Sequence, residues 1–360
     1  MLNKVIISGG GTGGHIFPAV AIANEIKRRY PNCEILFVGA LGKMEMEKIP
    51  EAGYPIVGLP IRGLQRTISL SNLNLPFLII KSLWKAFNLI REFKPEVVIG
   101  VGGYASATTL YVASKLRIPC LVQEQNSYAG LTNKLLANKA MKFCVAYENM
   151  EQFFPKEKIV ITGNPVRKVI LLVEQKNQEE EKANLGFDKK QPLVLAVGGS
   201  LGALTINNTM QSGLQQLADN GIQLLWQTGK NFTPNTEGFL QTKALSFITD
   251  MAAAYAAADI VVSRAGALSI SELCVTGKPV ILVPSPNVAE DHQTKNAKAL
   301  VKNEAAIMIA DKDANQFLIS SMIALLKNEE NKNKLSLAIK KMASPNAVNL
   351  IVNQIELLKQ

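Results

Sequence analysis

Histidine and cysteine are scarce in this chain of 360 residues, which contains 2 His and 4 Cys. The cysteines lie far apart and form no C-x-x-C pair, so a zinc site with the usual spacing of ligands is excluded. Scattered cysteines in a chain of this length are typical of small buried side chains in a reducing compartment. We therefore expect neither a structural metal nor a disulfide framework.

Long uninterrupted hydrophobic runs are also missing. The best candidate for a membrane span is interrupted by Lys81 and Lys85 and falls short of the roughly 18 apolar residues that a span requires. Residues 1–8 carry one lysine and run straight into glycines without a cleavage site, which predicts a first strand and not a signal peptide. These absences predict a cytoplasmic protein that can associate with a membrane from its surface.

The hydrophobic fraction and the net charge predict a folded protein with an acidic partner. A hydrophobic fraction of 48% over 360 residues supports about two domains, each with its own core. The formal net charge of +10 favours nucleic acid, anionic lipid or a phosphate-rich substrate as the partner. A nucleic-acid-binding protein finds no support, because the chain has no recognisable binding motif and its basic residues cluster beside apolar ones.

Short β-branched runs alternate with longer amphipathic stretches, which is the pattern of βαβ units around mostly parallel sheets. The pattern starts again at Leu193–Val197, so we predict one Rossmann-like domain over residues 1–163 and a second over residues 164–345. Residues 346–360 are expected to form a last amphipathic helix, and the sequence pattern leaves open which of the two domains it packs on. The charged segment Glu174–Lys190 has the composition of a solvated helix or loop.

A glycine loop at residues 9–15 follows the strand Val5–Ile7 and precedes a helical stretch, Ala19–Arg29. Glycines there let the backbone approach a ligand closely, and the N–H groups at the start of a helix suit phosphate or a developing anion. The alternative is a tight turn that binds nothing.

The same loop matches G-x-G-x-x-G through Gly9, Gly11 and Gly14, which by itself would indicate a dinucleotide cofactor. Such a site also needs an acidic residue at the end of the second strand, but Ile35–Val38 ends in Gly-Ala-Leu. A Walker-type phosphate loop is absent from the sequence as well. We therefore expect neither a dinucleotide cofactor nor an NTPase.

Two further loops of this kind occur in the second half. One contains Ser200, whose hydroxyl suits a phosphate, and the other, at Val261–Ser269, opens a helix that carries Glu272. A carboxylate in that position can accept both hydroxyls of a ribose, although the helix dipole also favours an acid near a helix start without any ligand. Together the loops predict one phosphate-bearing ligand in the crevice at the carboxyl ends of both sheets.

Six segments in order along the chain resemble the MurG family of bacterial peptidoglycan N-acetylglucosaminyltransferases. They are Gly10–Ala19, Gly102–Ser106, Glu124–Gly130, Gly163–Arg167, Gly198–Ser200 and Asp250–Tyr255. The resemblance continues to at least Asp291–Ala297 and so covers nearly the whole chain.

The resemblance implies an α/β protein with the GT-B glycosyltransferase fold, in which two Rossmann-like domains have parallel sheets that face a central cleft. It implies an acceptor-binding and membrane-binding first domain, a UDP-GlcNAc-binding second domain and a final helix that crosses back to the first. The implied reaction is an inverting transfer of N-acetylglucosamine from UDP-GlcNAc to undecaprenyl-pyrophosphoryl-MurNAc-pentapeptide (lipid I), which gives lipid II and UDP. An enzyme of the same fold that acts on another membrane lipid is the alternative.

The implied setting is the cytoplasmic face of the bacterial inner membrane, with an anionic membrane surface and cell-wall synthesis and division proteins as partners, and without nucleic acid. No cofactor or metal is expected. The family's donor contacts fall on twelve positions of this sequence: Thr12, Gly13, Gly14, Asn126, Arg167, Ser200, Ile248, Ala267, Leu268, Ser269, Glu272 and Gln293. The chain departs from common family residues at Gln123, Leu201 and Ser269.

His15 is our candidate for the general base that activates the acceptor hydroxyl, or for the partner of that base. Its place at a helix start disfavours the imidazolium and keeps the ring able to accept a proton, although a structural hydrogen bond is the alternative role. Glu124 and Tyr104 are the competing candidates, and either can instead orient the acceptor. Asp311-Lys312-Asp313 is a literal D-x-D, but its place before a helix predicts an N-cap and not a metal site.

A basic and apolar stretch between Arg62 and Lys94 predicts the membrane face. Within it, residues 76–90 form a helical pattern whose apolar side chains cover more surface than one packed face would use. Phe77, Lys81, Trp84 and Lys85 are the residues we expect at an anionic bilayer. The alternative is an ordinary buried helix with solvated lysines. Lys134, Lys139 and Lys142 are expected to add to this basic face.

Overall fold

The computed structural model describes residues 1–63, 75–199 and 201–359, and the chain divides into two compact units. Unit 1 comprises Met1–Pro165 and Asn346–Gln360, and unit 2 comprises Val166–Pro345. The first change of unit therefore lies after Pro165, where the sequence predicts a boundary after residue 163. Each unit is an α/β structure with one parallel sheet, as the repeated strand and helix pattern predicts.

In the described part of unit 1, seven parallel strands follow the order β3-β2-β1-β4-β5-β6-β7. They are β1 (Lys4–Ser8), β2 (Glu34–Ala40), β3 (Ile56–Leu59), β4 (Val97–Gly100), β5 (Cys120–Glu124), β6 (Lys142–Val145) and β7 (Ile159–Ile161). Successive side chains of a strand point to opposite faces, so Val5 and Ile7 join one hydrophobic cluster while Ile6 joins another. Both faces of the sheet are thus buried, as parallel sheets require.

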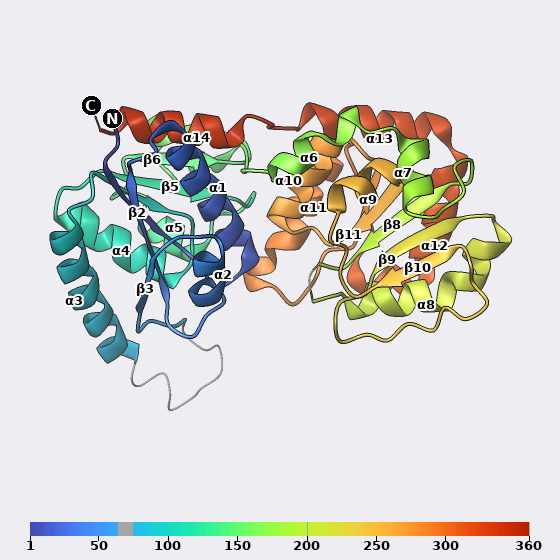
Figure 1. Cartoon of the computed structure of the whole chain (residues 1–360), viewed down its shortest axis with the longest axis horizontal. Helices are drawn as coiled ribbons and strands as arrows, with labels where there is room; N and C mark the ends of the chain where they lie inside the picture. The colour runs from blue at the N-terminus through green and yellow to red at the C-terminus, as the bar shows by residue number, and fades with distance from the viewer. Residues whose placement is uncertain (64–74, 200, 360) are drawn as a thin grey trace. The chain divides into compact units, whose positions relative to one another are not determined.

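Helices cover both faces of this sheet (Figure 1). The helices of unit 1 are α1 (Gly13–Arg29), α2 (Glu45–Glu51), α3 (Leu75–Phe93), α4 (Tyr104–Lys115), α5 (Leu131–Leu135) and α14 (Ala347–Leu357), with short 3-10 turns η2 (Met150–Gln152) and η3 (Lys156–Lys158). Ile22 of α1 and Ile351 of α14 share a cluster with Val5, whereas Ala86 of α3 and Leu110 of α4 share one with Ile6. The loops after β1, β4 and β5 leave the sheet at its carboxyl edge, and these strands are neighbours.

The last helix belongs to unit 1. Arg29 near the end of α1 donates hydrogen bonds to Asn353 Oδ1 at 2.6 Å and to Glu356 Oε1 at 3.0 Å on α14. Arg29 also pairs with the buried Glu25 at 2.8 Å. Figure 1 shows α14 crossing one end of α1, and residues 346–360 therefore complete the fold of the first half of the chain.

In the described part of unit 2, six parallel strands follow the order β10-β9-β8-β11-β12-β13. They are β8 (Leu193–Val197), β9 (Gln223–Gln227), β10 (Thr242–Leu245), β11 (Ile260–Ser263), β12 (Val280–Leu282) and β13 (Ile307–Met308). The core centres on the buried Trp226, whose Nε1 donates to Asn207 Oδ1 at 3.0 Å.

The helices of unit 2 surround this sheet. They are α6 (Lys168–Leu171), α7 (Gln178–Asn184), α8 (Leu204–Asp219), α9 (Met251–Ala257), α10 (Ala267–Thr276), α11 (His292–Lys302), α12 (Ala314–Lys327) and α13 (Glu329–Lys341), with 3-10 turns η4 (Val173–Gln175), η5 (Ala289–Asp291) and η6 (Asp311–Asp313).

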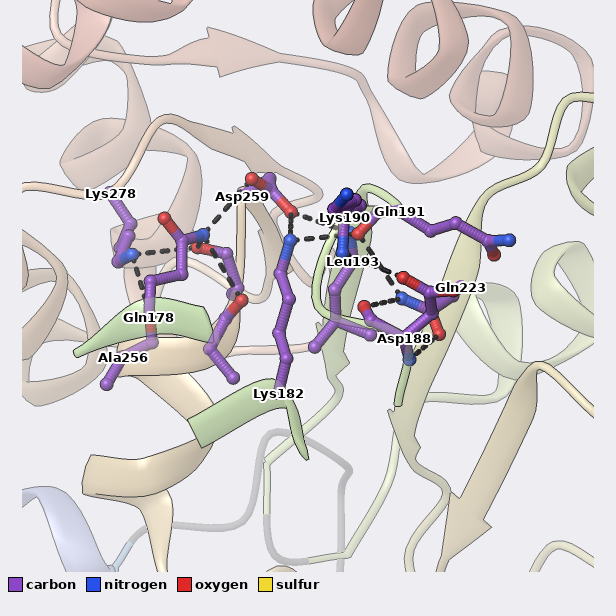
Figure 2. Close-up of polar contacts among 12 residues, drawn as sticks. Gln178, Lys182, Asp188, Lys190, Gln191, Leu193, Gln223, Ala256, Asp259 and Lys278 are labelled. Atoms are coloured by element: carbon purple, nitrogen blue, oxygen red, sulfur yellow. Dashed lines mark hydrogen bonds and ion pairs between the residues drawn. The ribbon is translucent and has the colours of Figure 1, made fainter. Parts of the chain in front are cut away.

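A group of polar side chains ties together the amino ends of β8 and β11 (Figure 2). Lys182 Nζ lies 2.7 Å from Asp259 Oδ2, and the same oxygen accepts the N–H of Leu193 at 2.7 Å. Lys182 also donates to the carbonyl of Gln191 at 2.8 Å and is buried. The prediction that the segment Glu174–Lys190 is solvated is wrong for Lys182, because Asp259 and the carbonyl of Gln191 take the place of water around its ammonium group.

Lys278 and Gln178 hold the end of α9 at the same edge of the sheet (Figure 2). Lys278 Nζ donates to the carbonyls of Ala256 at 3.0 Å and Ala258 at 2.8 Å, and Gln178 Nε2 donates to Ala258 at 3.0 Å. Burial lowers the pKa of Lys278 to about 8, since the charged ammonium loses hydration there. Structural contacts occupy this amino edge of the sheet, which leaves the opposite, carboxyl edge for a ligand.

Candidate active site

The loop between β1 and α1 has the backbone that only glycine adopts easily. Gly10 and Gly11 have φ values of +156° and +88°. Thr12 is the N-cap residue of α1, Gly13 and Gly14 begin the helix, and its first turn contains no acidic side chain. The N–H groups of such a first turn lack partners within the helix and favour an anion.

His15 lies in the first turn of α1, and its Nδ1 is 2.8 Å from the carbonyl oxygen of Gly10. A carbonyl oxygen accepts only, so Nδ1 carries the proton and Nε2 of the neutral ring is left as the acceptor. The ring lies against Gly102, where an added Cβ would be only 2.7 Å from Nε2. This is the tautomer that a general base acting through Nε2 requires.

The loops after β1 and β4 are interlocked. The N–H of Gly10 donates to the carbonyl of Gly102 at 3.3 Å, and a Cβ on Gly103 would lie 2.8 Å from the carbonyl oxygen of Gly10. Tyr104, the first residue of α4, is exposed, and its ring lies close to Gly63. The structure therefore brings the Gly-Gly-Tyr loop beside the His15 loop, as neighbouring parallel strands allow.

Glu124 ends β5 and is buried. Its Oε1 accepts the N–H of Asn126 at 3.0 Å, and its Oε2 accepts the N–H of Gly130 at 3.0 Å and Asn133 Nδ2 at 2.8 Å. Both carboxylate oxygens are thus occupied by donors of the following loop. This arrangement shapes the loop that carries Asn126.

Amide side chains fill the space behind this loop. Gln123 Nε2 donates to Asn164 Oδ1 at 2.8 Å, and Asn164 Nδ2 donates to the carbonyl of Gln125 at 3.0 Å. Gln125 Nε2 donates to the carbonyl of Val101 at 2.9 Å, which links β5 to the loop after β4. Gln123, which departs from the common family residue, is therefore a buried structural amide.

In unit 2, Arg167 and Glu272 form a two-point ion pair. Arg167 Nε lies 2.6 Å from Glu272 Oε1, and Nη2 lies 2.8 Å from Oε2. The hydrogen bond to Glu272 raises the pKa of Arg167, and burial raises the pKa of the neighbouring Tyr255. The family resemblance implies that Arg167 and Glu272 contact one ligand, which stays a prediction, and the structure shows that the two side chains contact each other.

Ala267, Leu268 and Ser269 form the first turn of α10, which has no acidic residue in its first turn. The loop before it is held by Asn296, a buried residue whose Nδ2 donates to the carbonyl of Ala265 at 3.4 Å. The start of this helix therefore offers N–H groups to an anion in the same way as α1 does.

Gln227 at the end of β9 joins two predicted parts of the donor site. Its Nε2 donates to the carbonyl of Gly199 at 2.9 Å, and its Oε1 accepts the N–H of Ile248 at 2.9 Å. Gly199 has a φ of +88°. Ser200 lies outside the described residues, so its predicted contact stays a prediction.

Gln293 lies in the first turn of α11, and its Oε1 accepts the N–H of Ser285 at 2.9 Å. The helix is preceded by Glu290 and Asp291, with φ values of 54° and 52°. Two consecutive non-glycine residues in the left-handed region are strained, and such strain concentrates in functional loops.

Asp311 pairs with Arg264 and accepts a hydrogen bond from Thr205 Oγ1 at 2.8 Å. Asp313 occupies the N-cap position of α12 without a side-chain cap bond. The carboxylate of Asp311 in the D-x-D is therefore engaged within the protein. Among the described residues, no group of three or more His, Cys, Asp or Glu side chains is arranged to hold a metal ion.

One side of α3 is apolar and exposed. Phe77 is 75% exposed, Ile80 65% and Trp84 68%, while the opposite side of the helix buries Ser82 and Ala86. Lys81 is exposed, but Lys85 is half-buried and donates to the carbonyl of Gly58 at 2.8 Å. Arg66, part of the same predicted basic stretch, lies outside the described residues. In the described ranges no helix has both the length and the apolar character needed to cross a membrane.

Three residues that hold the loops of the candidate site are not among those predicted from the sequence: Glu45, Gln227 and Asn296. Gln227 carries a weak signal, since it is a polar residue at the end of a buried strand, whereas Asn296 lies inside a polar helical stretch and carries none. Glu45 carries no such signal, because it is 34 residues away in sequence from Gly11, whose N–H it accepts at 2.8 Å.

Family profiles match both halves of the chain. The N-terminal domain of glycosyltransferase family 28 matches residues 5–145, and the C-terminal domain of the same family matches residues 193–353. Curated relatives include the proteins named UDP-N-acetylglucosamine–N-acetylmuramyl-(pentapeptide) pyrophosphoryl-undecaprenol N-acetylglucosamine transferase of Parabacteroides distasonis and Porphyromonas gingivalis. The first is 52% identical over 98% of this chain and 97% of its own length, and the second is 54% identical over 98% and 94%.

Solved structures similar to this chain include a member of the same family. The crystal structure of MurG from Acinetobacter baumannii is 29% identical, covers 98% of this chain and 99% of its own, and superposes with a TM-score of 0.79. A UDP-N-acetylglucosamine 2-epimerase, at 12% identity, covers 98% of this chain and 95% of its own with a TM-score of 0.64. The epimerase shares the fold alone, so the fold by itself does not identify the reaction.

Proposed function

The chain belongs to the MurG family within glycosyltransferase family 28, and on this premise we propose that it transfers N-acetylglucosamine from UDP-GlcNAc to lipid I. The products are lipid II and UDP, so the protein is a hexosyltransferase of peptidoglycan synthesis. Relatives that are 51–54% identical over nearly the whole chain carry this activity in their names. Nothing favours the alternative of a different membrane lipid as acceptor.

The observation that carries the mechanism is the hydrogen bond from His15 Nδ1 to the carbonyl of Gly10. Nε2 accepts the proton of the 4-hydroxyl of the N-acetylmuramyl group, and that oxygen attacks C1 of the α-linked sugar. The bond between C1 and the β-phosphate oxygen breaks, the configuration at C1 inverts, and UDP departs with the electron pair. General-base assistance of this kind contributes about 10²- to 10⁴-fold in rate.

Glu124 is better suited to position the acceptor loop than to take the proton, because both of its oxygens already accept hydrogen bonds. Tyr104 is exposed beside the His15 loop and is suited to contact the acceptor sugar or its peptide. The donor contacts in the loop regions of unit 1 are Thr12, Gly13, Gly14 and Asn126.

In unit 2 we assign Arg167 to the diphosphate and Glu272 to the ribose. The ion pair uses Nε and Nη2 of Arg167, which leaves Nη1 for a phosphate oxygen, and Glu272 keeps further lone pairs for hydroxyl groups. Within unit 2, the first turn of α10 adds N–H groups for the charge that develops on UDP. Ser200, Ile248, Ala267, Leu268, Ser269 and Gln293 complete the proposed donor set.

We propose that the chemistry needs no metal or other cofactor. The basis is the donor set itself, since Arg167 and the helix N-termini supply the positive charge that a metal would bring to the leaving group. Unchanged turnover in excess chelator is the expected result, and loss of activity that added Mg²⁺ restores would contradict this assignment.

The protein acts at the cytoplasmic face of the inner membrane as a peripheral protein. Phe77, Trp84 and Lys81 on the exposed side of α3 support this location, because aromatic and basic side chains together favour an anionic bilayer surface. Lys85 is assigned to the base of this face, where its ammonium contacts Gly58. Cell-wall synthesis and division proteins are further partners that we propose from family membership.

The direct test is incubation of the full chain with UDP-GlcNAc and a lipid I analogue. We expect UDP release together with a β-1,4-linked disaccharide product, and the absence of both would overturn the proposed function. His15→Ala is expected to lower kcat by about 10²- to 10⁴-fold while UDP binding persists. Wild-type turnover by His15→Ala would remove His15 from the mechanism and leave the reaction itself intact.

A further inference from the structure

Glu45 is the first residue of α2, and its carboxylate contacts the backbone of the glycine loop at residues 9–15. The side chain is 1% exposed, and its carboxylate accepts the N–H of Gly11 at 2.8 Å and the N–H of Ala40 at 3.0 Å. The carboxylate occupies the space that a side chain on Gly10 would need, since an added Cβ would be 2.1 Å from Glu45 Cδ. The loop and the carboxylate therefore fit each other.

One peptide group connects this carboxylate to the histidine. The N–H of Gly11 and the carbonyl of Gly10 belong to the same peptide unit. Its N–H side donates to Glu45 Oε2 at 2.8 Å, and its carbonyl side accepts from His15 Nδ1 at 2.8 Å. The Glu45 carboxylate is therefore connected to the His15 imidazole through the peptide group between Gly10 and Gly11.

We propose that Glu45 is a positioning residue that acts on His15 through the Gly10–Gly11 peptide group. The proposal rests on the proposed function, in which His15 Nε2 accepts the acceptor's proton. Glu45 takes no proton in the reaction. It keeps the carbonyl of Gly10 aimed at Nδ1 and makes that carbonyl a stronger acceptor, so the imidazolium formed in the reaction is stabilised.

The physical basis is the mutual polarisation of hydrogen bonds in a chain. A charged acceptor on the N–H of a peptide increases the negative charge on its carbonyl oxygen, and the effect is larger away from water. In serine proteases a buried aspartate holds the catalytic imidazole in its tautomer and stabilises its charged form by direct contact. Here a peptide group stands between the two side chains.

The burial of Glu45 supports a role beyond sealing the loop. A buried carboxylate is costly unless its charge is compensated, and a neutral side chain could fill the same space more cheaply. Among the ion pairs of the described residues, none includes Glu45. Its carboxylate is therefore stabilised by the N–H groups of Gly11 and Ala40, and the peptide group of the first also contacts His15.

Kinetics of Glu45→Gln provide the first test. The amide oxygen can accept only one of the two N–H groups, and the amide nitrogen then faces the other. We expect kcat to fall by about ten- to a hundredfold, as for a misplaced catalytic group, with little change in KM for UDP-GlcNAc. Glu47→Gln is the matched control, because Glu47 lies on the same helix and is exposed, and it should behave as wild type.

The tautomer of His15 provides a readout that a purely structural role would not move. The chain has 2 histidines, so ¹⁵N-histidine labelling gives a simple ring spectrum, and His15→Ala identifies the His15 signals. We expect the Nδ1–H form in the wild type and a larger Nε2–H population in Glu45→Gln. Glu45→Asp, which keeps the charge at shorter reach, should lie between the two in both tautomer and kcat.

The outcomes separate the two proposals. A slow Glu45→Gln enzyme with an unchanged tautomer, or one as fast as wild type, would overturn the role of Glu45. A tautomer that responds to Glu45→Gln while His15→Ala remains active would support the coupling and refute His15 as the base. Thermal unfolding of each variant shows whether it is folded. If Glu45→Gln does not fold, the kcat and the His15 tautomer of Glu45→Asp test the role of Glu45 instead.

Discussion

Arg167 and Glu272 each fix the other's position through two hydrogen bonds, at 2.6 and 2.8 Å. A ligand that contacts both side chains finds them already oriented, so less conformational entropy is lost on binding. Lysine could keep the charge at position 167 but could not form the planar two-point contact. The geometry of the guanidinium therefore matters as well as its charge.

We expect Arg167→Lys to raise KM for UDP-GlcNAc and to weaken UDP binding by about ten- to a hundredfold. This range corresponds to the loss of one hydrogen bond to a charged group, about 1.5–3 kcal/mol. Calorimetric titration with UDP measures the effect without the acceptor. Lys168→Ala, at an exposed neighbouring position, serves as the control. Equal UDP affinity for Arg167→Lys and wild type would exclude Arg167 from the donor site.

Single residues also show the limit of reading this site from sequence. His15 and Glu272 could be proposed from the sequence because each lies in or just after a glycine motif that opens a helix. Glu45, Gln227 and Asn296 could not be proposed in this way, because each forms a hydrogen bond with a backbone group of a loop that is far away in the sequence. Only the packing of strands and helices brings them there.

At the scale of elements, strands and helices follow the sequence pattern closely. The predicted strand Leu193–Val197 has the same bounds as β8, and residues 76–90 fall within α3. Buried β-branched runs and long amphipathic stretches are strong local signals. The pattern fails at α7, where Lys182 looks solvated but is paired with Asp259, because an ion-pair partner 77 positions away leaves no mark on local composition.

The docking of α14 on α1 depends on Arg29, which contacts Asn353, Glu356 and the buried Glu25. We expect Arg29→Ala to destabilise this docking by about 2 kcal/mol, since the hydrogen bonds from Arg29 to Asn353 and Glu356 on α14 are lost. Hydrogen exchange in residues 346–358 should become faster. Arg28→Ala is the matched control, because Arg28 also pairs with Glu25 but its hydrogen bonds go to that residue on its own helix, whereas those of Arg29 reach α14.

The stability that the pairs of Glu25 with Arg28 and Arg29 contribute should depend on pH. The hydrogen bond from Arg28, with help from Arg29, lowers the pKa of Glu25 from 4.5 to about 2. Stability from the ionised carboxylate is therefore present above pH 4.5 and is lost as the pH falls toward 2. The effect of Arg29→Ala should shrink over that window, and unchanged exchange in α14 at neutral pH would contradict the assigned role of Arg29.

At the scale of the whole molecule, the net charge of +10 and the apolar side of α3 suit the proposed binding to a membrane surface. Coulombic attraction to an anionic surface is long-ranged and screened by salt, whereas insertion of Phe77 and Trp84 is short-ranged and insensitive to it. The two contributions can therefore be separated experimentally.

We expect binding to vesicles of phosphatidylglycerol and phosphatidylcholine that weakens as salt rises. Phe77→Ser with Trp84→Ser should lower the partition coefficient at least about tenfold, since burying one large apolar side chain is worth roughly 1.5–3 kcal/mol. Leu240→Ser, at a 96% exposed position in unit 2, is the control. Co-sedimentation that is unchanged in the double variant at low salt would show that α3 is not the membrane face.

The return of α14 to unit 1 has a consequence for biosynthesis. Unit 2 is an insertion between residues 165 and 346 of unit 1, and Figure 1 shows the two chain ends together. A ribosome synthesises the inserted unit in full before α14 emerges, so residues 166–345 can fold while unit 1 still exposes the apolar residues that Ile351 and Ile355 later cover. The half of the protein that is made first is thus the half that is finished last.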